Sequence, residues 1–207
     1  DEVAALSSCP LRELTPTKLG RYAQSALVTW GGVEDFKYYL PRIFELVVRE
    51  PGWTDALVFE KLALADWRSW PADEQDAVNE FFDALWAWSL DAGPDIIGAD
   101  DLLRGIGLAG CDLAPWLATL RGDRSLAATR QIARLVFLER RDLATGSLAS
   151  YWHPKDRELL LEFLSAEETG RRIEDPDRCD GMDLAVAPWV DAGVHKSRRH
   201  AIAEAGV

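Results

Sequence analysis

The sequence is poor in cysteine and histidine, and neither residue occurs in a metal-binding pattern. Its three cysteines, Cys9, Cys111 and Cys179, include no CxxC pair. An odd number of widely spaced thiols argues against a disulfide framework and a structural zinc site, and favours a reducing cytoplasm. The sequence also lacks HExxH, the helical ligand spacing of many catalytic zinc sites. We therefore predict no metal site and no bound cofactor.

Long apolar runs, strand patterns and catalytic loops are missing as well. No stretch approaches the roughly 18 apolar residues that span a bilayer, and no basic start followed by an apolar segment indicates a secretory signal. No stretch alternates polar and apolar residues as a half-buried strand does. Neither a GxSxG elbow nor a phosphate-binding glycine loop occurs. The sequence thus predicts an all-α protein, and we interpret Cys111 as a small buried thiol.

The clearest predicted helix covers residues 70–93, WPADEQDAVNEFFDALWAWSLDAG. Pro71 suits a first helical position, because its φ is fixed and it has no N–H to leave unpaired. A projection at about 100° per residue separates an apolar side from an acidic side. The apolar side consists of Ala77, Val78, Phe81, Phe82, Leu85, Trp86 and Trp88. The acidic side consists of Asp73, Asp76, Glu80 and Asp83.

Glycine and proline separate the other predicted helices. Thr15 and Pro16 form a cap and first turn for a helix that runs to about Trp30. The helix over residues 33–50 keeps one apolar side across Pro41, which predicts one kinked helix or two coaxial helices. The remaining predicted helices cover residues 54–67, a short segment from 100, and residues 113–120, 124–143, 153–169 and 182–192.

Helices of this length, joined by short turns, favour antiparallel hairpins that pack in succession. We expect an irregular multi-helix domain, with a short HEAT-like solenoid as the alternative, because only one short sequence echo suggests an internal repeat. The echo pairs residues 112–117 with residues 183–190. We predict a single helical domain over residues 11–192, between a flexible lead at 1–10 and a flexible tail at 193–207.

Negative charge is concentrated in one part of the chain. The formal net charge is −12, and residues 50–101 hold thirteen acidic residues against only Lys61 and Arg68. That segment therefore carries a net charge of −11, and it also contains five of the nine tryptophans. A field of this sign repels nucleic-acid phosphates and anionic lipids. We predict that the protein binds neither nucleic acid nor membranes.

Arginines recur between residues 121 and 141. They could form an anion-binding or nucleic-acid-binding patch, or they could pair with acidic side chains within the fold. We favour internal pairing, because leaving the arginines and the acidic side chains unpaired would cost more free energy.

The predicted helix over residues 70–93 also offers a candidate binding surface. Trp86 and Trp88 diverge by about 200°, so we place them at the two borders of the apolar side, with one or both partly exposed. A hot spot for a basic partner typically combines a tryptophan that anchors the partner with carboxylates that attract it by charge. The candidate partner-binding residues are Asp73, Asp76, Glu80, Asp83, Trp86 and Trp88. The alternative is an ordinary solvated acidic surface over a tryptophan-rich core.

Residues 11–90 resemble a bacterial family of uncharacterised, all-helical proteins. The resemblance lies in LRELTPTKLGRYAQSALVTWGGVEDFKYYLPRIFELV and in the later segment DWRSWP. It covers less than half of the chain and implies a bacterial source. It implies no known activity, and it carries over no catalytic residue.

These features predict a non-enzymatic, cytoplasmic protein-binding module whose acidic, tryptophan-bordered helix engages the basic surface of another protein. Two alternatives stay open. Carboxylates such as Asp73 and Asp100 could hold a divalent cation in a hydrolase, since magnesium prefers carboxylate oxygens, although catalytic carboxylates need burial to shift their pKa. The protein could instead have a structural role in which it associates with itself as a homo-oligomer.

Overall fold

The computed structural model describes residues 6, 9–50, 57–94, 96–143, 146, 148 and 152–173. This part of the chain contains nine α-helices, two 3-10 helices and no β-strand, so the protein is all-α, as predicted. The predicted cap at Thr54, the helix at 182–192 and the flexible tail at 193–207 lie outside the described residues, as does most of the predicted lead at 1–10.

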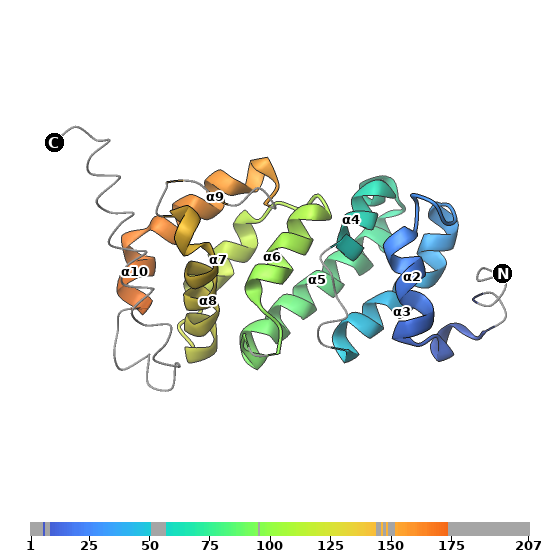
Figure 1. Cartoon of the computed structure of the whole chain (residues 1–207), viewed down its shortest axis with the longest axis horizontal. Helices are drawn as coiled ribbons and strands as arrows, with labels where there is room; N and C mark the ends of the chain where they lie inside the picture. Colours follow the sequence, from blue (N-terminus) through green and yellow to red (C-terminus); the bar gives the residue numbers. More distant parts are fainter. Residues whose placement is uncertain are drawn as a thin grey trace. The chain divides into compact units, whose positions relative to one another are not determined.

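The helices follow one another along the chain (Figure 1). Their bounds are α2 Pro16–Ser25, α3 Val33–Arg49, α4 Leu57–Leu64, α5 Ala72–Ala92, α6 Ala99–Leu108, α7 Ala114–Gly122, α8 Leu126–Leu143, α9 Pro154–Ser165 and α10 Glu167–Ile173. The 3-10 helices are η1 Leu11–Glu13 and η2 Trp67–Ser69. Within the described residues, none of the helices combines the length and the apolar character needed to cross a membrane.

The chain divides into two compact units. Unit 1 comprises residues 1–85 and 108–110, and unit 2 comprises residues 86–107 and 111–207. Helix α5 contributes to both, because its residues up to Leu85 belong to unit 1 and the later ones to unit 2. The single domain expected over 11–192 and the HEAT-like solenoid stay predictions.

Side-chain caps fix the starts of two helices of unit 1. The hydroxyl of Thr15 accepts a hydrogen bond from the backbone N–H of Lys18 at 3.4 Å, and Pro16 opens α2, as predicted. At α3, the carboxylate of Asp35 accepts a hydrogen bond from the backbone N–H of Gly32 at 2.9 Å. Each cap satisfies a backbone donor that the first turn of a helix leaves without a partner.

Two helices of unit 1 end earlier than predicted. Helix α2 ends at Ser25, because Ala26 leaves the helical conformation with ψ of 139° and Leu27 is left-handed, with φ of 66°. Helix α4 ends at Leu64, because Asp66 is also left-handed, with φ of 49°, and η2 follows. A left-handed residue cannot continue a right-handed helix. By contrast, α3 continues through Pro41 as one helix rather than two.

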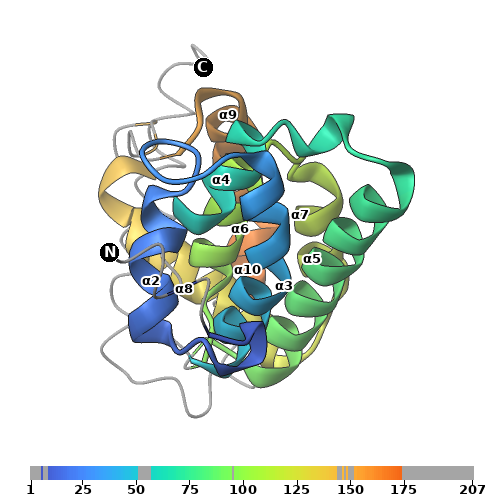
Figure 2. The ribbon, with the colours of Figure 1, turned by 90° about the vertical axis from the view of Figure 1, so that its right-hand side faces the viewer.

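Aromatic side chains fill much of unit 1. Phe59 and Phe82 are almost fully buried, and their rings meet edge to face with centroids 5.1 Å apart. Helix α2 packs against both α3 and α4 (Figure 2). Trp67 is also buried, and its indole Nε1 donates a hydrogen bond to the carbonyl oxygen of Ala109 at 2.8 Å. This bond ties residues 108–110 to the rest of unit 1.

Helix α8 packs against α9 and α10, which also pack against each other, so these three helices form the body of unit 2. Ile132, Leu135 and Val136 of α8 are almost fully buried. The predicted helix over residues 153–169 is instead two helices, because Ala166 adopts an extended conformation with ψ of 138° between α9 and α10.

Candidate functional site

The four predicted carboxylates of α5 lie on one exposed side of the helix within unit 1. Asp73, Asp76, Glu80 and Asp83 are all exposed, and we call this set the acidic stripe. Their spacing of three, four and three residues places them on the same side of an α-helix. None of the four forms an ion pair with another described residue. The stripe is therefore an exposed row of negative charge without an internal counter-ion in the described part of the chain.

The opposite side of the same helix segment is core. Val78, Phe82 and Leu85 are buried, as the helical projection predicts. The apolar side is narrower than predicted, because Ala77 is exposed and Phe81 is half-buried. The ring of Phe81 instead stacks on the ring of Phe44 of α3, with the centroids 3.7 Å apart. Burial of one side orients the helix and holds the acidic stripe toward solvent.

Charged groups close to the start of α5 are paired, unlike the stripe. The ammonium group of Lys37 lies 2.6 Å from the carboxylate of Glu74. The same ammonium lies 4.6 Å from the ring centroid of Trp70, a cation–π geometry. The guanidinium of Arg68 lies over the ring of Trp67, 3.9 Å from its centroid. Cations of this region are thus engaged with groups other than the acidic stripe.

The two tryptophans predicted to border the stripe differ in exposure, and both belong to unit 2. Trp86 is only 3% exposed, so its prediction as a surface anchor is wrong. The ring of Trp116 on α7 meets it edge to face, with centroids 6.0 Å apart, and its indole N–H has no hydrogen-bond partner among the described residues. Trp88 is half-buried, as expected for a border position.

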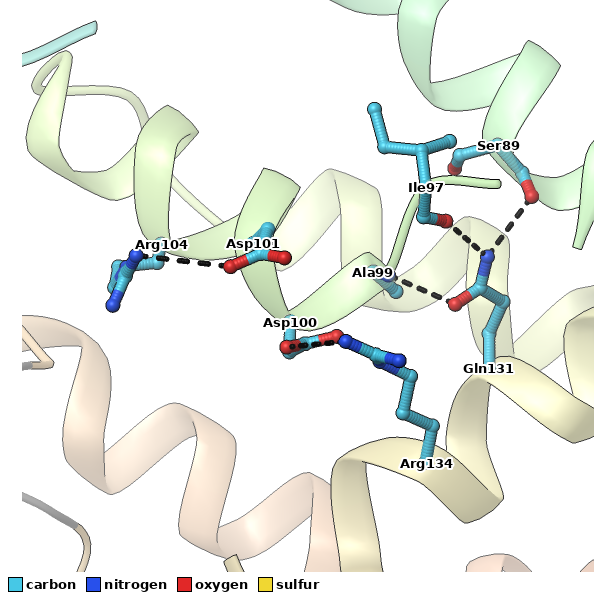
Figure 3. Close-up of polar contacts among 8 residues, drawn as sticks. All are labelled: Ser89, Ile97, Ala99, Asp100, Asp101, Arg104, Gln131 and Arg134. Atoms are coloured by element: carbon cyan, nitrogen blue, oxygen red, sulfur yellow. Dashed lines mark hydrogen bonds and ion pairs between the residues drawn. The ribbon is translucent and has the colours of Figure 1, made fainter. Parts of the chain in front are cut away.

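An ion pair joins α8 to the start of α6 in unit 2 (Figure 3). The Nε atom of Arg134 lies 2.7 Å from a carboxylate oxygen of Asp100, so the prediction that these arginines pair within the fold is confirmed at this position. The next carboxylate, Asp101, lies 3.7 Å from the guanidinium of Arg104. Both aspartates therefore contact arginines, and one of them, Asp100, is a residue that the sequence offered as a ligand for a cation.

Gln131, beside that ion pair, is a polar residue whose role the sequence did not predict. Its side chain is fully buried. Its Oε1 accepts a hydrogen bond from the N–H of Ala99 at 2.8 Å, and its Nε2 donates to the carbonyl oxygens of Ser89 at 3.0 Å and Ile97 at 2.9 Å (Figure 3). One carboxamide thus joins α8 to the end of α5 and to the start of α6 within unit 2.

The described residues contain no group of three or more His, Cys, Asp or Glu side chains that could hold a metal ion. His153 caps the start of α9, because its Nδ1 accepts a hydrogen bond from the backbone N–H of Lys155 at 3.3 Å. Cys111 is buried, as predicted for a small apolar thiol. His153 therefore caps a helix, and Cys111 is part of the packed interior.

Asp156, in the first turn of α9, is a buried acid that the sequence analysis did not single out. It is 4% exposed. Burial raises the pKa of Asp156, and nearby Asp112 raises it further, against the charges of Lys155 and His153. A Cβ atom at position 107 would lie 2.6 Å from its carboxylate oxygen. Gly107 therefore allows the start of α9 to approach α6.

Replacing Asp156 with asparagine is expected to stabilise the protein more at neutral than at acidic pH. Because its folded pKa is raised, Asp156 favours folding below its unfolded pKa of about 3.9, and that contribution is lost as pH rises through the folded pKa. Urea unfolding between about pH 3 and pH 7 measures the difference. Glu162→Gln, at an exposed position of the same helix, is the control. A constant difference between Asp156→Asn and the parent protein at all pH values would contradict this prediction.

The chain was compared with known protein families, curated proteins and solved structures. No family model, curated protein or solved structure matches it. The predicted relation to a bacterial family therefore stays a prediction, and the candidate site is defined by the geometry of the acidic stripe.

Proposed function

We propose that the protein is a protein-binding module that engages a basic surface of another protein through the acidic stripe. The observation that supports this proposal is the row of exposed carboxylates, Asp73, Asp76, Glu80 and Asp83, which form no ion pair with another described residue. The resemblance over residues 11–90 and the odd number of widely spaced cysteines in the sequence support placing this activity in a bacterial cytoplasm.

The spacing of the stripe gives a physical reason for partner binding. Neighbouring like charges three or four residues apart on a helix destabilise it by about 0.2–0.5 kcal/mol per pair. Cationic groups of a partner would relieve this repulsion, and the long-range field would speed the encounter. Negatively charged surfaces, such as nucleic acid and anionic lipid, would be repelled. The stripe therefore favours a basic protein surface over those partners.

The two tryptophans enter this proposal differently. Trp86 is excluded as a contact, because it is buried against Trp116. Trp88 is half-buried, so its exposed edge stays available as an aromatic contact on α5. We expect the four carboxylates to provide most of the attraction to the partner, and Trp88 to add a smaller contact.

Reversing two charges of the stripe tests the proposal. In the variant Asp76→Lys with Glu80→Lys, we expect partner affinity to fall at least about tenfold, because attraction becomes repulsion. The fold should persist, since surface substitutions change stability by about 0.5 kcal/mol or less. A photo-crosslinking residue at exposed Ala77, between the two positions, would capture the partner for identification by mass spectrometry. Its binding can then be measured with purified proteins.

The matched control reverses two exposed acids with the same spacing on another helix, Glu158→Lys with Glu162→Lys on α9. It changes the net charge by the same amount and should keep the partner. Binding should also weaken as salt rises, because exposed charges are screened. Equal binding by the parent, the stripe variant and the control would show that the stripe is not the interface.

A further inference from the structure

The start of α9 meets the end of α6 at a buried acid. The carboxylate of Asp156 is buried, and it forms no hydrogen bond or ion pair with another described residue. A Cβ atom at position 107 would lie 2.6 Å from its Oδ2 atom and 3.8 Å from a methyl group of Leu113. The carboxyl group is therefore packed against the backbone of α6, beside an apolar side chain.

A lysine and a buried cysteine complete this contact. The Nζ atom of Lys155 donates a hydrogen bond to the carbonyl oxygen of Cys111 at 3.1 Å. The N–H of Cys111 donates in turn to the carbonyl oxygen of Ile106 in α6 at 3.1 Å. A cation is favoured at the C-terminal end of a helix, so Lys155 holds the first turn of α9 in place. We call the packing of Lys155 and Asp156 on Gly107 and Cys111 the α9 contact.

The surroundings of Asp156 oppose its ionised form on balance. Burial has the largest effect and raises its pKa, and Asp112 adds a like charge. The last carbonyl groups of α6 add partial negative charge. The charges of Lys155 and His153, and the N-terminus of α9 itself, act in the opposite direction. Among the described residues, α8 and α10, which also pack against α9, add no charge that acts on Asp156.

We propose that the α9 contact is a pH-sensitive switch, which is closed when Asp156 is neutral and opens when Asp156 is ionised. A buried charge without a partner is much less stable than the same charge in water. Ionisation therefore favours a state in which the first turn of α9 moves away from α6, loses the hydrogen bond from Lys155 and exposes Cys111. The rest of α9 stays packed on α8 and α10, so the contact opens without unfolding of the protein.

The direction of the pH effect follows from the higher pKa of Asp156 in the closed state. At acidic pH the carboxyl group is neutral in both states, and the contact is closed. As the pH rises from the ordinary pKa of aspartate to the pKa of the closed state, the open state binds fewer protons and gains population, by at most about tenfold per pH unit. Above that range the population of the open state is constant.

The accessibility of Cys111 tests the switch on the full chain. Methyl methanethiosulfonate labels the thiols from about pH 4, near the ordinary pKa of aspartate, to about pH 8, and mass spectrometry gives the rate at Cys111. The reference variant is Asp156→Asn, which has nearly the same shape and does not ionise. Both proteins keep Lys155 and His153, so the ratio of their rates removes the pH dependence of the thiol itself.

We expect the ratio of the parent rate to the Asp156→Asn rate to lie close to one at acidic pH and to rise toward neutral pH, by at most about tenfold per pH unit. The thiol of Cys9, which is half-exposed, is the internal reference. Its ratio should stay at one throughout.

A second variant tests the geometry. In Gly107→Ala, the new Cβ atom would lie 2.6 Å from the carboxylate of Asp156, which is too close for the closed state. Cys111 should therefore be labelled faster than in the parent protein even at acidic pH, although alanine favours a helix more than glycine does. Gly122→Ala on α7 is the matched control, because a Cβ atom there meets no atom within 4 Å.

Urea separates this opening from unfolding of the whole protein. The α9 contact exposes little surface when it opens, so labelling through it should change little with urea below the unfolding transition, whereas labelling through global unfolding rises steeply. A ratio that rises with pH, together with fast labelling of Gly107→Ala, supports the switch. A ratio that does not change with pH, equal labelling of Gly107→Ala and Gly122→Ala, or a steep dependence on urea would overturn it.

Discussion

Replacing Gln131 with methionine is expected to lower the free energy of unfolding by about 3 kcal/mol, because it leaves buried backbone groups without partners at about 1–3 kcal/mol each. In the parent protein, the carboxamide bonds to the N–H of Ala99 and to the carbonyl oxygens of Ser89 and Ile97. Methionine keeps nearly the same volume, so the loss reports these hydrogen bonds rather than a cavity.

Urea unfolding followed by circular dichroism measures the effect. Gln24→Met, the same substitution at an exposed position of α2, is the control and should change stability by about 0.5 kcal/mol or less. If Gln131→Met is as stable as that control, the three hydrogen bonds do not hold the end of α5 and the start of α6 against α8.

The second large effect is expected at Arg172. Arg172→Met should destabilise the protein by about 3–5 kcal/mol, because hydrogen bonds that involve a charged group contribute about 1.5–3 kcal/mol each and several are lost together. Its guanidinium donates to carbonyl oxygens at the end of α7 and, through Nε, to the hydroxyl of Thr129 at 3.0 Å. A cation at a helix C-terminus also interacts favourably with the helix dipole.

The neighbouring arginine provides the control for this substitution. Arg171 is exposed and lies 3.7 Å from the carboxylate of Glu167, so Arg171→Met should cost less than about 1 kcal/mol. Arg172→Lys should fall between the two, since an ammonium keeps the charge but cannot reach several carbonyls in fixed directions. Thermal unfolding of the three variants gives the order. Equal melting temperatures for Arg171→Met and Arg172→Met would contradict the role of Arg172.

Local sequence patterns were enough to predict several features of the fold. The alternation of apolar and acidic residues along α5 follows the helical period, so its buried Phe82 and its exposed acidic stripe could be assigned before the structure. Thr15 and Pro16 start α2 as predicted, because a helix cap depends on residues only a few positions apart. The helical period of a segment predicts which of its residues are exposed when no other helix covers that side.

Features that depend on distant partners could not be predicted in this way. Trp86 lies at the border of the apolar side of α5, but Trp116 of another helix covers it. Gln131 is one of several polar residues of α8, and Arg172 is one of several of α10. Their hydrogen-bond partners lie 32 to 52 positions away in the sequence. The left-handed conformation of Leu27 could not be predicted either, because glycine is the usual residue at a left-handed position.

The hydrogen bond from Trp67 to Ala109 limits where the chain can be divided into stable fragments. Unit 1 receives its last residues, 108–110, after the chain has already passed through part of unit 2. A fragment that stops at Leu85 would expose the indole of Trp67, which is 1% exposed in the whole chain, and remove the acceptor of its N–H. A stable fragment of unit 1 must therefore extend at least to Gly110, or a short peptide that contains residues 108–110 must be added to it. The same holds for fragments produced by limited proteolysis.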